Sequence, residues 1–334
     1  MKAVQLHAFE GPGGYRVADL PEPRPGPGEA VVRIRATSLN YRDLLVARGD
    51  YSRKIPLPLV PLSDGAGEVI EVGPGVSRVR VGDRVASAFM PAWIDGPPTD
   101  AGANSALGAA APGVLTEFIA LPADGLVSIP EHLTFEEAAT LPCAAVTAWH
   151  ALVIEGNVRA GETVLIQGTG GVSLFALQFA RLAGARVIAT SSSEEKLERA
   201  IRMGASDGIN YQATPDWEAR VLELTDGLGV DHVVEVGGAG TLPRSIKAVR
   251  RGGRISLIGV LTGGEIDPRP LLMKNVRAQG IFVGSRAMFE GMNRAIALHK
   301  LRPVVDQVFP IDRTAEALRH LESGSHFGKV VIRV

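Results

Sequence analysis

The chain has 334 residues, of which 46% are hydrophobic and 21% are charged, and its formal net charge is −1. This length favours two domains, and the near-zero charge gives no sign of a nucleic-acid partner or of an anionic membrane surface. Cys143 is the single cysteine, so no disulfide forms within one chain, and the first residues contain no apolar stretch of signal-peptide length. We therefore expect a cytoplasmic protein.

The first 125 residues are typical of a β-rich domain. Hydrophobic and polar side chains alternate over 30–39, and short strands bounded by glycine are expected at 65–73 and 82–89. The Gly82–Asp83 pair within 79–85 predicts a hairpin turn between two β-strands. Residues 91–113 are rich in proline, glycine and alanine without periodicity, which predicts a long loop near a pocket.

From residue 131 the pattern changes to strands that alternate with helices. Thr134 and Glu137 have the spacing of a helix-capping box. Short apolar strands between helices indicate a parallel sheet covered on both faces, which is a doubly wound α/β domain over 126–299. The tail, 300–334, returns to strand, helix and strand and is assigned to the first domain. The expected strands are 162–168, 185–190, 207–210, 230–236, 253–259 and 279–285, and the expected helices are 171–183, 194–203, 215–225 and 241–250.

A glycine-rich turn follows the first strand of this α/β region. Gly168 allows a tight turn, and Gly170 and Gly171 let the backbone approach a pyrophosphate at the start of the next helix. Ser173 stands where a third small residue normally packs helix against strand, so a slight spreading is expected. The turn, including Thr169 and Val172, is predicted to bind a dinucleotide.

The end of the next strand bears on the choice of cofactor. An acidic residue about twenty positions after the first glycine normally binds the ribose 2′-hydroxyl, but here the strand runs into three serines, Ser191–Ser193. Hydroxyls of Ser191 and Ser192, together with Lys196, can donate to a 2′-phosphate. The pattern favours NADP(H) over NAD(H). A simple helix cap is the alternative explanation of the serines, and Glu194 and Glu195 weaken the case if they face the ribose.

The whole chain resembles the medium-chain dehydrogenase/reductase superfamily. The stretches that carry the resemblance are SLNYRDLLVARGDY (38–51), PLVPLSDGAGEVIEVGPGVSRVRVGDRV (58–85), AATLPCAAVTAWHAL (138–152), the glycine turn with its flanks, and the final GKVVIRV. Within the superfamily the chain looks most like the zinc-independent quinone oxidoreductases of the ζ-crystallin-like branch. The resemblance implies a Rossmann cofactor domain, a GroES-like substrate domain and a homodimer.

The zinc-containing branch of this superfamily is the nearest alternative. Catalytic zinc needs three protein ligands, and the family's ligand positions align with Asn40, Ser63 and Cys143. Asparagine and serine are poor zinc ligands, and residues 91–113 lack the four cysteines of a structural zinc site. We therefore expect no zinc, and a pocket without a cation to stabilise a developing negative charge. Cys143 is expected to be a small buried residue near the cofactor.

The resemblance implies roles for residues in both domains. Tyr51 matches a proposed proton donor of related enoyl reductases, Asn40 is a candidate donor to a carbonyl oxygen, and Asp43 is a weaker catalytic candidate that orders its loop. Arg286 and Lys329 are weaker candidates for cofactor contacts, and the default expectation for both is a surface cation. Thr147 and Tyr211 match cofactor-binding positions, and strand-end loops add the further candidates Gly237, Gly238, Ile258, Gly259, Val260, Val283, Gly284 and Ser285.

These residues favour a metal-free, NADPH-dependent reductase of quinones or α,β-unsaturated carbonyl compounds. Hydride addition to such acceptors gives an enolate or phenolate, which is much less basic than a simple alkoxide and needs less help from a Lewis acid. Two alternatives stay open. One is an alcohol dehydrogenase that works without zinc, and the other is an NADPH-binding sensor or structural protein without turnover.

Overall fold

The computed structural model describes residues 1–259 and 261–334, which form two compact units. Unit 1 comprises Met1–Val146 and Val283–Val334, and unit 2 comprises Thr147–Phe282. The sequence places these boundaries at 125 and 299 instead. Unit 1 extends further because β7 (Leu126–Ser128) pairs with β5 (Arg84–Ser87), and α10 (Arg286–His299) contacts β7. The Asn293 side chain on α10 donates to the Ser128 carbonyl at 2.9 Å.

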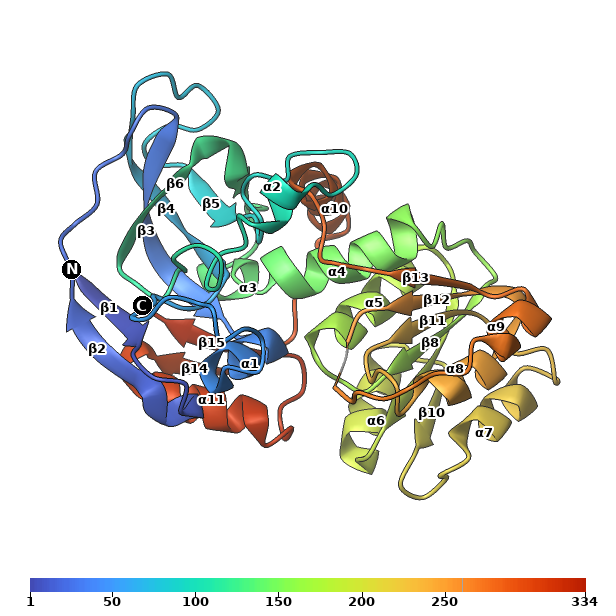
Figure 1. Cartoon of the computed structure of the whole chain (residues 1–334). Helices are drawn as coiled ribbons and strands as arrows, with labels where there is room; N and C mark the ends of the chain where they lie inside the picture. The colour runs from blue at the N-terminus through green and yellow to red at the C-terminus, as the bar shows by residue number, and fades with distance from the viewer. Residues whose placement is uncertain (260) are drawn as a thin grey trace. The chain divides into compact units, whose positions relative to one another are not determined.

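A seven-stranded sheet forms the centre of unit 1 (Figure 1). Its strand order is β14-β15-β3-β4-β5-β7, with β6 also paired to β3, and β1 and β2 form a separate hairpin. The C-terminal strand β15 lies between β14 and β3, as expected for a tail that returns to the first domain. The remaining strands are β1 Lys2–Leu6, β2 Tyr15–Asp19, β3 Glu29–Ser38, β4 Asp64–Val72, β6 Phe118–Pro122, β14 Val305–Pro310 and β15 Lys329–Arg333.

Two segments of unit 1 differ from the sequence-based expectation. Residues 79–81 form no strand, so the predicted hairpin around Gly82 is wrong, and β5 pairs with β4 across a longer connection. The 91–113 segment is ordered by a short helix and by buried side chains such as Trp93 and Leu107. The unit 1 helices are α1 Tyr41–Arg48, α2 Asp100–Ala103, α3 Phe135–Ala138, α10, α11 Thr314–Glu322, and the short η1 Gly11–Gly14, η2 Ala123–Gly125, η3 Leu141–Ala145 and η5 Ile311–Arg313.

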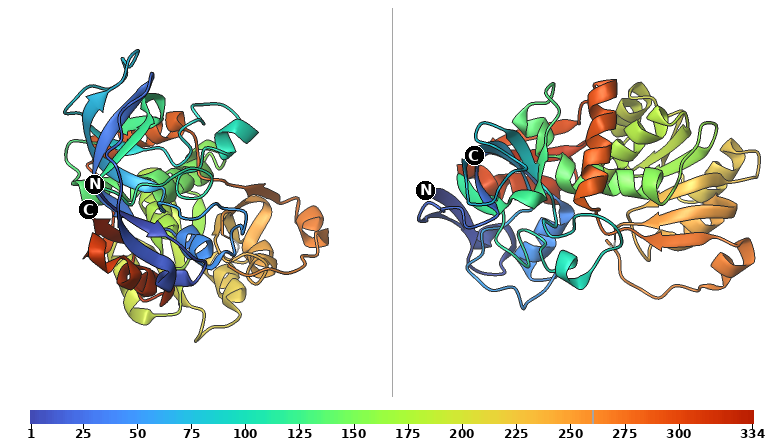
Figure 2. Two further views of the ribbon diagram at one scale, coloured as in Figure 1. Left: turned by 60° about the vertical axis from the view of Figure 1, so that its left-hand side comes forward. Right: turned by 90° about the horizontal axis from the view of Figure 1, so that it is seen from above.

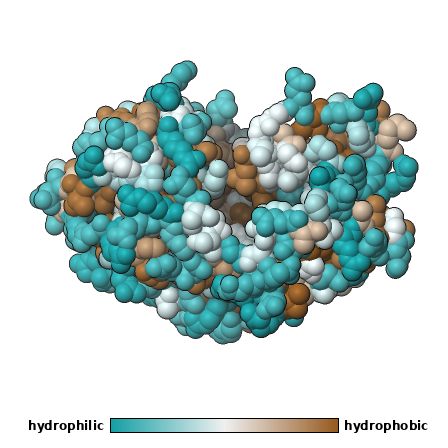
Figure 3. All heavy atoms as spheres, turned by 90° about the horizontal axis from the view of Figure 1, so that it is seen from below, coloured by the Kyte–Doolittle hydropathy of each residue, from teal (hydrophilic) through white to brown (hydrophobic). Residues whose placement is uncertain are grey.

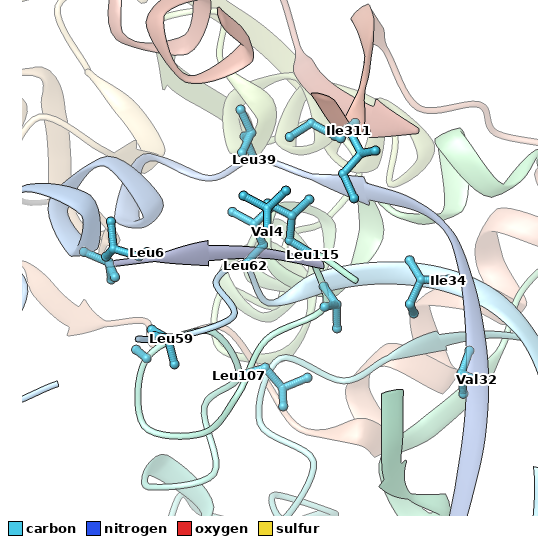
Figure 4. Close-up of a cluster of buried hydrophobic side chains, with 14 of the residues drawn as sticks. Val4, Leu6, Val32, Ile34, Leu39, Leu59, Leu62, Leu107, Leu115 and Ile311 are labelled. Carbon is cyan, nitrogen blue, oxygen red and sulfur yellow. The ribbon is translucent and has the colours of Figure 1, made fainter. Parts of the chain in front are cut away.

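The core of unit 1 joins segments that are far apart in the sequence. Figure 4 shows Val4 of β1 close to Leu62 and Leu115, with Leu6 at the other end of the strand and Leu39 and Ile311 above Val4 in this view. The Thr134–Glu137 capping box predicted for α3 is confirmed. Because the core uses both the first 146 residues and the last 52, the polar groups that border it also come from both segments.

Unit 2 contains a six-stranded parallel sheet with helices on both faces (Figures 1 and 2). Its strand order, β10-β9-β8-β11-β12-β13, is the doubly wound order of dinucleotide-binding domains. The strands are β8 Thr163–Gln167, β9 Arg186–Ser191, β10 Asp207–Asn210, β11 Val230–Glu235, β12 Val249–Leu257 and β13 Arg277–Gly280. The helices are α4 Val146–Trp149, η4 His150–Ile154, α5 Gly171–Leu182, α6 Glu194–Arg202, α7 Trp217–Leu224, α8 Leu242–Ala248 and α9 Arg269–Lys274.

The expected strands and helices of unit 2 are confirmed, except at its C-terminal edge. The strand predicted at 279–285 instead ends at Gly280, and Val283 has a positive φ of 53°, which no β-strand accepts. The helix α10 that follows was not predicted. On the face drawn in Figure 3, hydrophilic residues cover most of the surface. No helix among the described residues is long and apolar enough to cross a bilayer.

Candidate nucleotide-binding and catalytic residues

The glycine turn of unit 2 joins the end of β8 to the start of α5. Gly168 has φ +70°, a left-handed conformation that glycine adopts without strain. Gly170 is the N-cap of α5, and its first turn has no side-chain cap. A Cβ built on Gly168 or Gly170 meets no atom within 4 Å. Uncapped amides beside open space fit a phosphate group, as the sequence predicts for this turn.

Ser173 does not spread the helix away from the strand. Its side chain is buried, and its hydroxyl donates to the Gln167 carbonyl at 2.6 Å. The residue that replaces a third glycine therefore connects the first turn of α5 directly to the end of β8. The expected spreading is replaced by a hydrogen bond.

Glu235, at the end of β11, is a site residue that the sequence reasoning missed. Its carboxylate is 0% exposed and accepts hydrogen bonds from Gln167 Nε2 (2.8 Å), Thr241 Oγ1 (2.5 Å) and Ser245 Oγ. It also accepts from the backbone N–H groups of Gly237 (2.8 Å) and Gly238 (3.1 Å). One buried carboxylate thus holds the loop after β11 against the residue that precedes the glycine turn. Its position at the end of a predicted strand, shortly before Gly237 and Gly238, is the sequence feature that could have identified it as a site residue.

Three of the predicted cofactor residues surround one open cavity of about 420 Å³. Gly168, Tyr211 and Gly237 all line it, together with Trp217 and Arg244. The cavity lies at the carboxyl ends of β8, β9 and β11, where doubly wound sheets bind nucleotides. Its size and its aromatic lining fit an adenosine group.

The three serines at the end of β9 differ in their contacts and in their exposure. Ser193 caps α6 by accepting from the Lys196 N–H, so the helix-cap explanation holds for this serine. Ser191 is buried at the end of the strand, and Ser192 is exposed. Glu194 accepts a hydrogen bond from Asn210 Nδ2 at 2.7 Å. No carboxylate occupies the tip of β9 itself.

The remaining predicted cofactor residues lie in several places. Thr147 is buried at the start of unit 2, and the N–H groups of Ile258 and Gly259 donate to the Glu235 carbonyl at 2.9 and 3.3 Å. Val260 lies outside the described residues. The other three belong to unit 1: Val283 has its unusual backbone angle, Gly284 packs against Val146 and Met288, and Ser285 caps α10.

Unit 1 contains a buried cluster of charged and polar side chains at the start of α1. The Asp43 carboxylate, 1% exposed, accepts from the Asn40 N–H at 2.7 Å and lies 3.7 Å from Arg42 Nη2. Burial raises the pKa of Asp43 to about 6, although Arg42 and Lys329 oppose this rise. The Asn-x-x-Asp spacing therefore fixes the beginning of a helix, as expected for Asp43.

Lys329 is the second feature that the sequence reasoning misjudged. It is 4% exposed, and its ammonium group donates to the Leu39 carbonyl and to Asn40 Oδ1, the latter at 2.6 Å. The prediction of a surface cation is therefore wrong for Lys329. Two cations, Lys329 and Arg42, therefore lie beside Asn40 and Asp43 in this cluster.

Arg42 connects the cluster to the 91–113 segment and to two aromatic rings. Its Nη2 donates to the Leu107 carbonyl at 2.7 Å, and its guanidinium carbon lies 4.3 Å from the Phe89 ring centre and 5.8 Å from that of Tyr51. Among the described residues, Arg42 Nε and Nη1 and Asn40 Nδ2 are buried and have no hydrogen-bond partner. The Tyr51 side chain is 41% exposed. Unpartnered buried donors are costly unless a ligand uses them. Arg286 lies on α10, where its Nη1 donates to the Asp124 carbonyl at 2.9 Å and its guanidinium forms an ion pair with Glu290.

The side chains at the zinc positions do not fit a zinc ion. Asn40 Oδ1 already accepts from a lysine ammonium, and the Ser63 hydroxyl donates to Asp64 at 2.7 Å. Cys143 is half-buried and is the one good zinc ligand of the three, and a single thiolate cannot hold the ion. Among the described residues, no three histidine, cysteine or acidic side chains form a group that could hold a metal ion.

Comparison with known proteins agrees with this two-part architecture. A zinc-binding dehydrogenase family model matches residues 171–297, and an alcohol dehydrogenase GroES-like domain model matches residues 26–131. A zinc-type alcohol dehydrogenase-like protein of Schizosaccharomyces pombe is 47% identical over 92% of this chain and 91% of its own length. The quinone oxidoreductase of Pongo abelii is 30% identical over 99% of this chain and 97% of its own length.

A solved structure extends the similarity to the full fold. The crystal structure of an NAD-dependent alcohol dehydrogenase is 40% identical, with a TM-score of 0.92 and complete coverage of both chains. The sequence relatives and this structure are named as alcohol dehydrogenases, alcohol dehydrogenase-like proteins or quinone oxidoreductases. The chain belongs to the medium-chain dehydrogenase/reductase superfamily and is an oxidoreductase of its quinone oxidoreductase and alcohol dehydrogenase-like group.

Proposed function

We propose that this enzyme is a metal-free, NADPH-dependent reductase that transfers hydride to quinones or to α,β-unsaturated carbonyl compounds. The observation that carries the proposal is the set of buried, unpartnered donors on Asn40 and Arg42, beside the buried ammonium of Lys329. These groups supply positive charge and N–H groups where the zinc branch of the family has a metal. An acceptor oxygen that gains negative charge satisfies them.

The chemistry divides between the nucleotide and the side chains of the chain. When bound, the nucleotide supplies the hydride. Asn40 Nδ2 and the Arg42 N–H groups donate to the acceptor oxygen, and such donors stabilise developing charge strongly because they are already oriented and shielded from water. Tyr51 provides the proton that completes the reduction. Its ring lies beside the Arg42 guanidinium, whose carbon is 5.8 Å from the ring centre.

The preference for NADPH is supported by the end of β9. The strand ends at Ser191 with no carboxylate to repel a 2′-phosphate, and Glu194 is bonded to Asn210. The test is Ser191→Asp, with Ser206→Asp as the control because exposed Ser206 lies at the opposite end of the sheet. We expect Ser191→Asp to lower kcat/KM for NADPH by about tenfold relative to NADH. An unchanged ratio, or faster wild-type turnover with NADH, contradicts the cofactor proposal.

Alcohol oxidation without zinc is the second candidate. It is favoured by the alcohol dehydrogenase names of relatives with 40–47% identity and by the Lys329 ammonium, which can help to stabilise an alkoxide. The distinguishing experiment measures NADPH oxidation with quinones, enones and aldehydes, and NADP⁺ reduction with alcohols, each with and without a chelator. Turnover restricted to alcohols favours the second candidate. Loss of activity on chelation contradicts the metal-free proposal, and tight NADPH binding without any turnover favours a sensor.

We also propose that the enzyme is a cytoplasmic homodimer that acts on a small molecule. The edge of the unit 2 sheet supports a dimer, because β13 pairs on one side only and exposed hydrophobic residues lie near it. Among these, Leu272 is 80% and Met273 is 72% exposed. Sedimentation velocity tests this assembly, and a monomer at micromolar concentration contradicts it.

A further inference from the structure

The contact between Lys329 and Asn40 fixes the orientation of the Asn40 side chain. A lysine ammonium has three donors and no acceptor, so only the amide oxygen of Asn40 can face it. The Nζ–Oδ1 distance of 2.6 Å is that of a charge-assisted hydrogen bond. The usual ambiguity between the oxygen and nitrogen of an asparagine side chain therefore does not arise here, because a reversed amide places an N–H group against the ammonium.

The amide nitrogen points away from Lys329 as a consequence. Asn40 Nδ2 is buried and has no partner among the described residues, whereas the backbone N–H of the same residue is bonded to Asp43. Withdrawal of electron density from Oδ1 by the ammonium also makes the Nδ2 hydrogens more positive, since linked hydrogen bonds polarise one another. Asn40 is thus presented as a donor with a fixed direction.

We propose that Lys329 is a positioning residue that orients and polarises Asn40, so that Asn40 Nδ2 donates to the acceptor oxygen that becomes negative during hydride transfer. This inference rests on the proposed function. It assigns to the last strand of the chain a part of the chemistry that the zinc branch assigns to a metal. Lys329 touches the amide and not the reacting atoms.

A purely structural role for Lys329 makes different predictions. Its ammonium also bonds to the Leu39 carbonyl and lies in a cluster with the buried carboxylates of Asp43 and Asp64. If Lys329 serves only to hold β15 against β3 or to balance those charges, its replacement lowers stability, and its effect on rate does not depend on Asn40. The two roles are separated by comparing the losses of rate. The losses caused by replacing Lys329 and Asn40 add up if Lys329 is purely structural, and they do not add up if Lys329 acts through Asn40.

The test is a double-mutant cycle with Lys329→Met and Asn40→Leu, measured as kcat/KM for a quinone at saturating NADPH. We expect each single variant to lose about tenfold or more, and the double variant to lose no more than Asn40→Leu alone. NADPH affinity, followed by nucleotide fluorescence, is expected to stay within about twofold of wild type. Lys329→Met with wild-type kcat/KM, or with the same loss in the Asn40→Leu background, overturns the inference.

Two further measurements keep the test decisive if a variant folds poorly or if quinones are not substrates. Lys329→Gln retains a polar side chain, but its amide can donate or accept and no longer dictates the orientation of Asn40, so an intermediate loss of kcat/KM is expected.

Binding of 4-nitrophenolate to the NADP⁺ complex probes the Asn40 Nδ2 donor without turnover. If the wild-type complex binds this oxyanion at least tenfold more tightly than the Lys329→Met complex, the inference is supported. This holds even if the protein does not reduce quinones and the proposed function fails. Equal affinities of the two complexes overturn the inference.

Discussion

The two candidate half-sites of this enzyme differ in composition: backbone groups form most of one, and charged side chains form most of the other. The nucleotide half-site of unit 2 consists mostly of backbone: glycines beside open space, an uncapped helix start, and a loop held by the buried carboxylate of Glu235. The cluster of unit 1 consists of side chains that carry charge, namely Arg42, Asp43, Asp64 and Lys329, and of the amide of Asn40. The first recognises a shape that many ligands share. The second can favour one class of acceptor, because side chains change without changing the fold.

The largest effect is expected at Glu235, the buried carboxylate that holds the loop after β11 in the unit 2 half-site. Glu235→Leu removes an acceptor that five donors share, and we expect a loss of about 3–5 kcal/mol in the free energy of unfolding. Urea denaturation measures this loss. Glu235→Gln keeps the shape and part of the acceptor capacity, so it should be less damaging. Equal, small effects of both substitutions contradict the role given to the carboxylate.

The unit 1 cluster makes a prediction about pH. Because the pKa of Asp43 is raised from 3.8 to about 6 in the folded protein, chiefly by burial, the folded state binds its proton more tightly than the unfolded state. Its contribution to stability is therefore present below about pH 4 and is lost as the pH rises through 6. We expect the stability of wild type relative to Asp43→Asn to fall by about 3 kcal/mol between pH 4 and pH 7.5. A constant difference shows that Asp43 keeps an ordinary pKa.

A substitution at the glycine turn tests the nucleotide half-site of unit 2. Gly170→Val introduces a side chain into open space, so it should leave stability nearly unchanged and raise KM for NADPH by about 10- to 100-fold. The matched control is Gly13→Val in unit 1, where an added Cβ also meets nothing within 4 Å. Similar KM values for both variants remove the glycine turn from the nucleotide site.

The smallest expected effect concerns Tyr51. Tyr51→Phe keeps the ring beside Arg42 and removes only the hydroxyl, so kcat should fall by about tenfold while KM for NADPH stays within about twofold. Steady-state kinetics with a quinone measures both constants. Small and equal changes in the two constants assign the protonation step to another group or to water.

Prediction from sequence succeeded where the information is local. The glycine turn, the strand and helix that flank it, and the Thr134–Glu137 capping box are each specified within a few residues, and the structure confirms them. The Lys329–Asn40 contact joins positions 289 apart, so no spacing or periodicity reveals it. The strand predicted at 279–285 failed for a related reason, because the backbone angle of Val283 depends on its surroundings and not on its β-forming side chain.

The position of β15 has a consequence for how the protein is made. This strand supplies Lys329 and fills the space between β14 and β3, yet it is synthesised after the whole of unit 2. During translation, the growing chain holds Asp43 with only one of its two cationic neighbours, and one edge of β3 without its neighbour, until the last few residues emerge. Unit 2 is complete earlier, so its sheet can form on the ribosome while the sheet of unit 1 waits for its final strand.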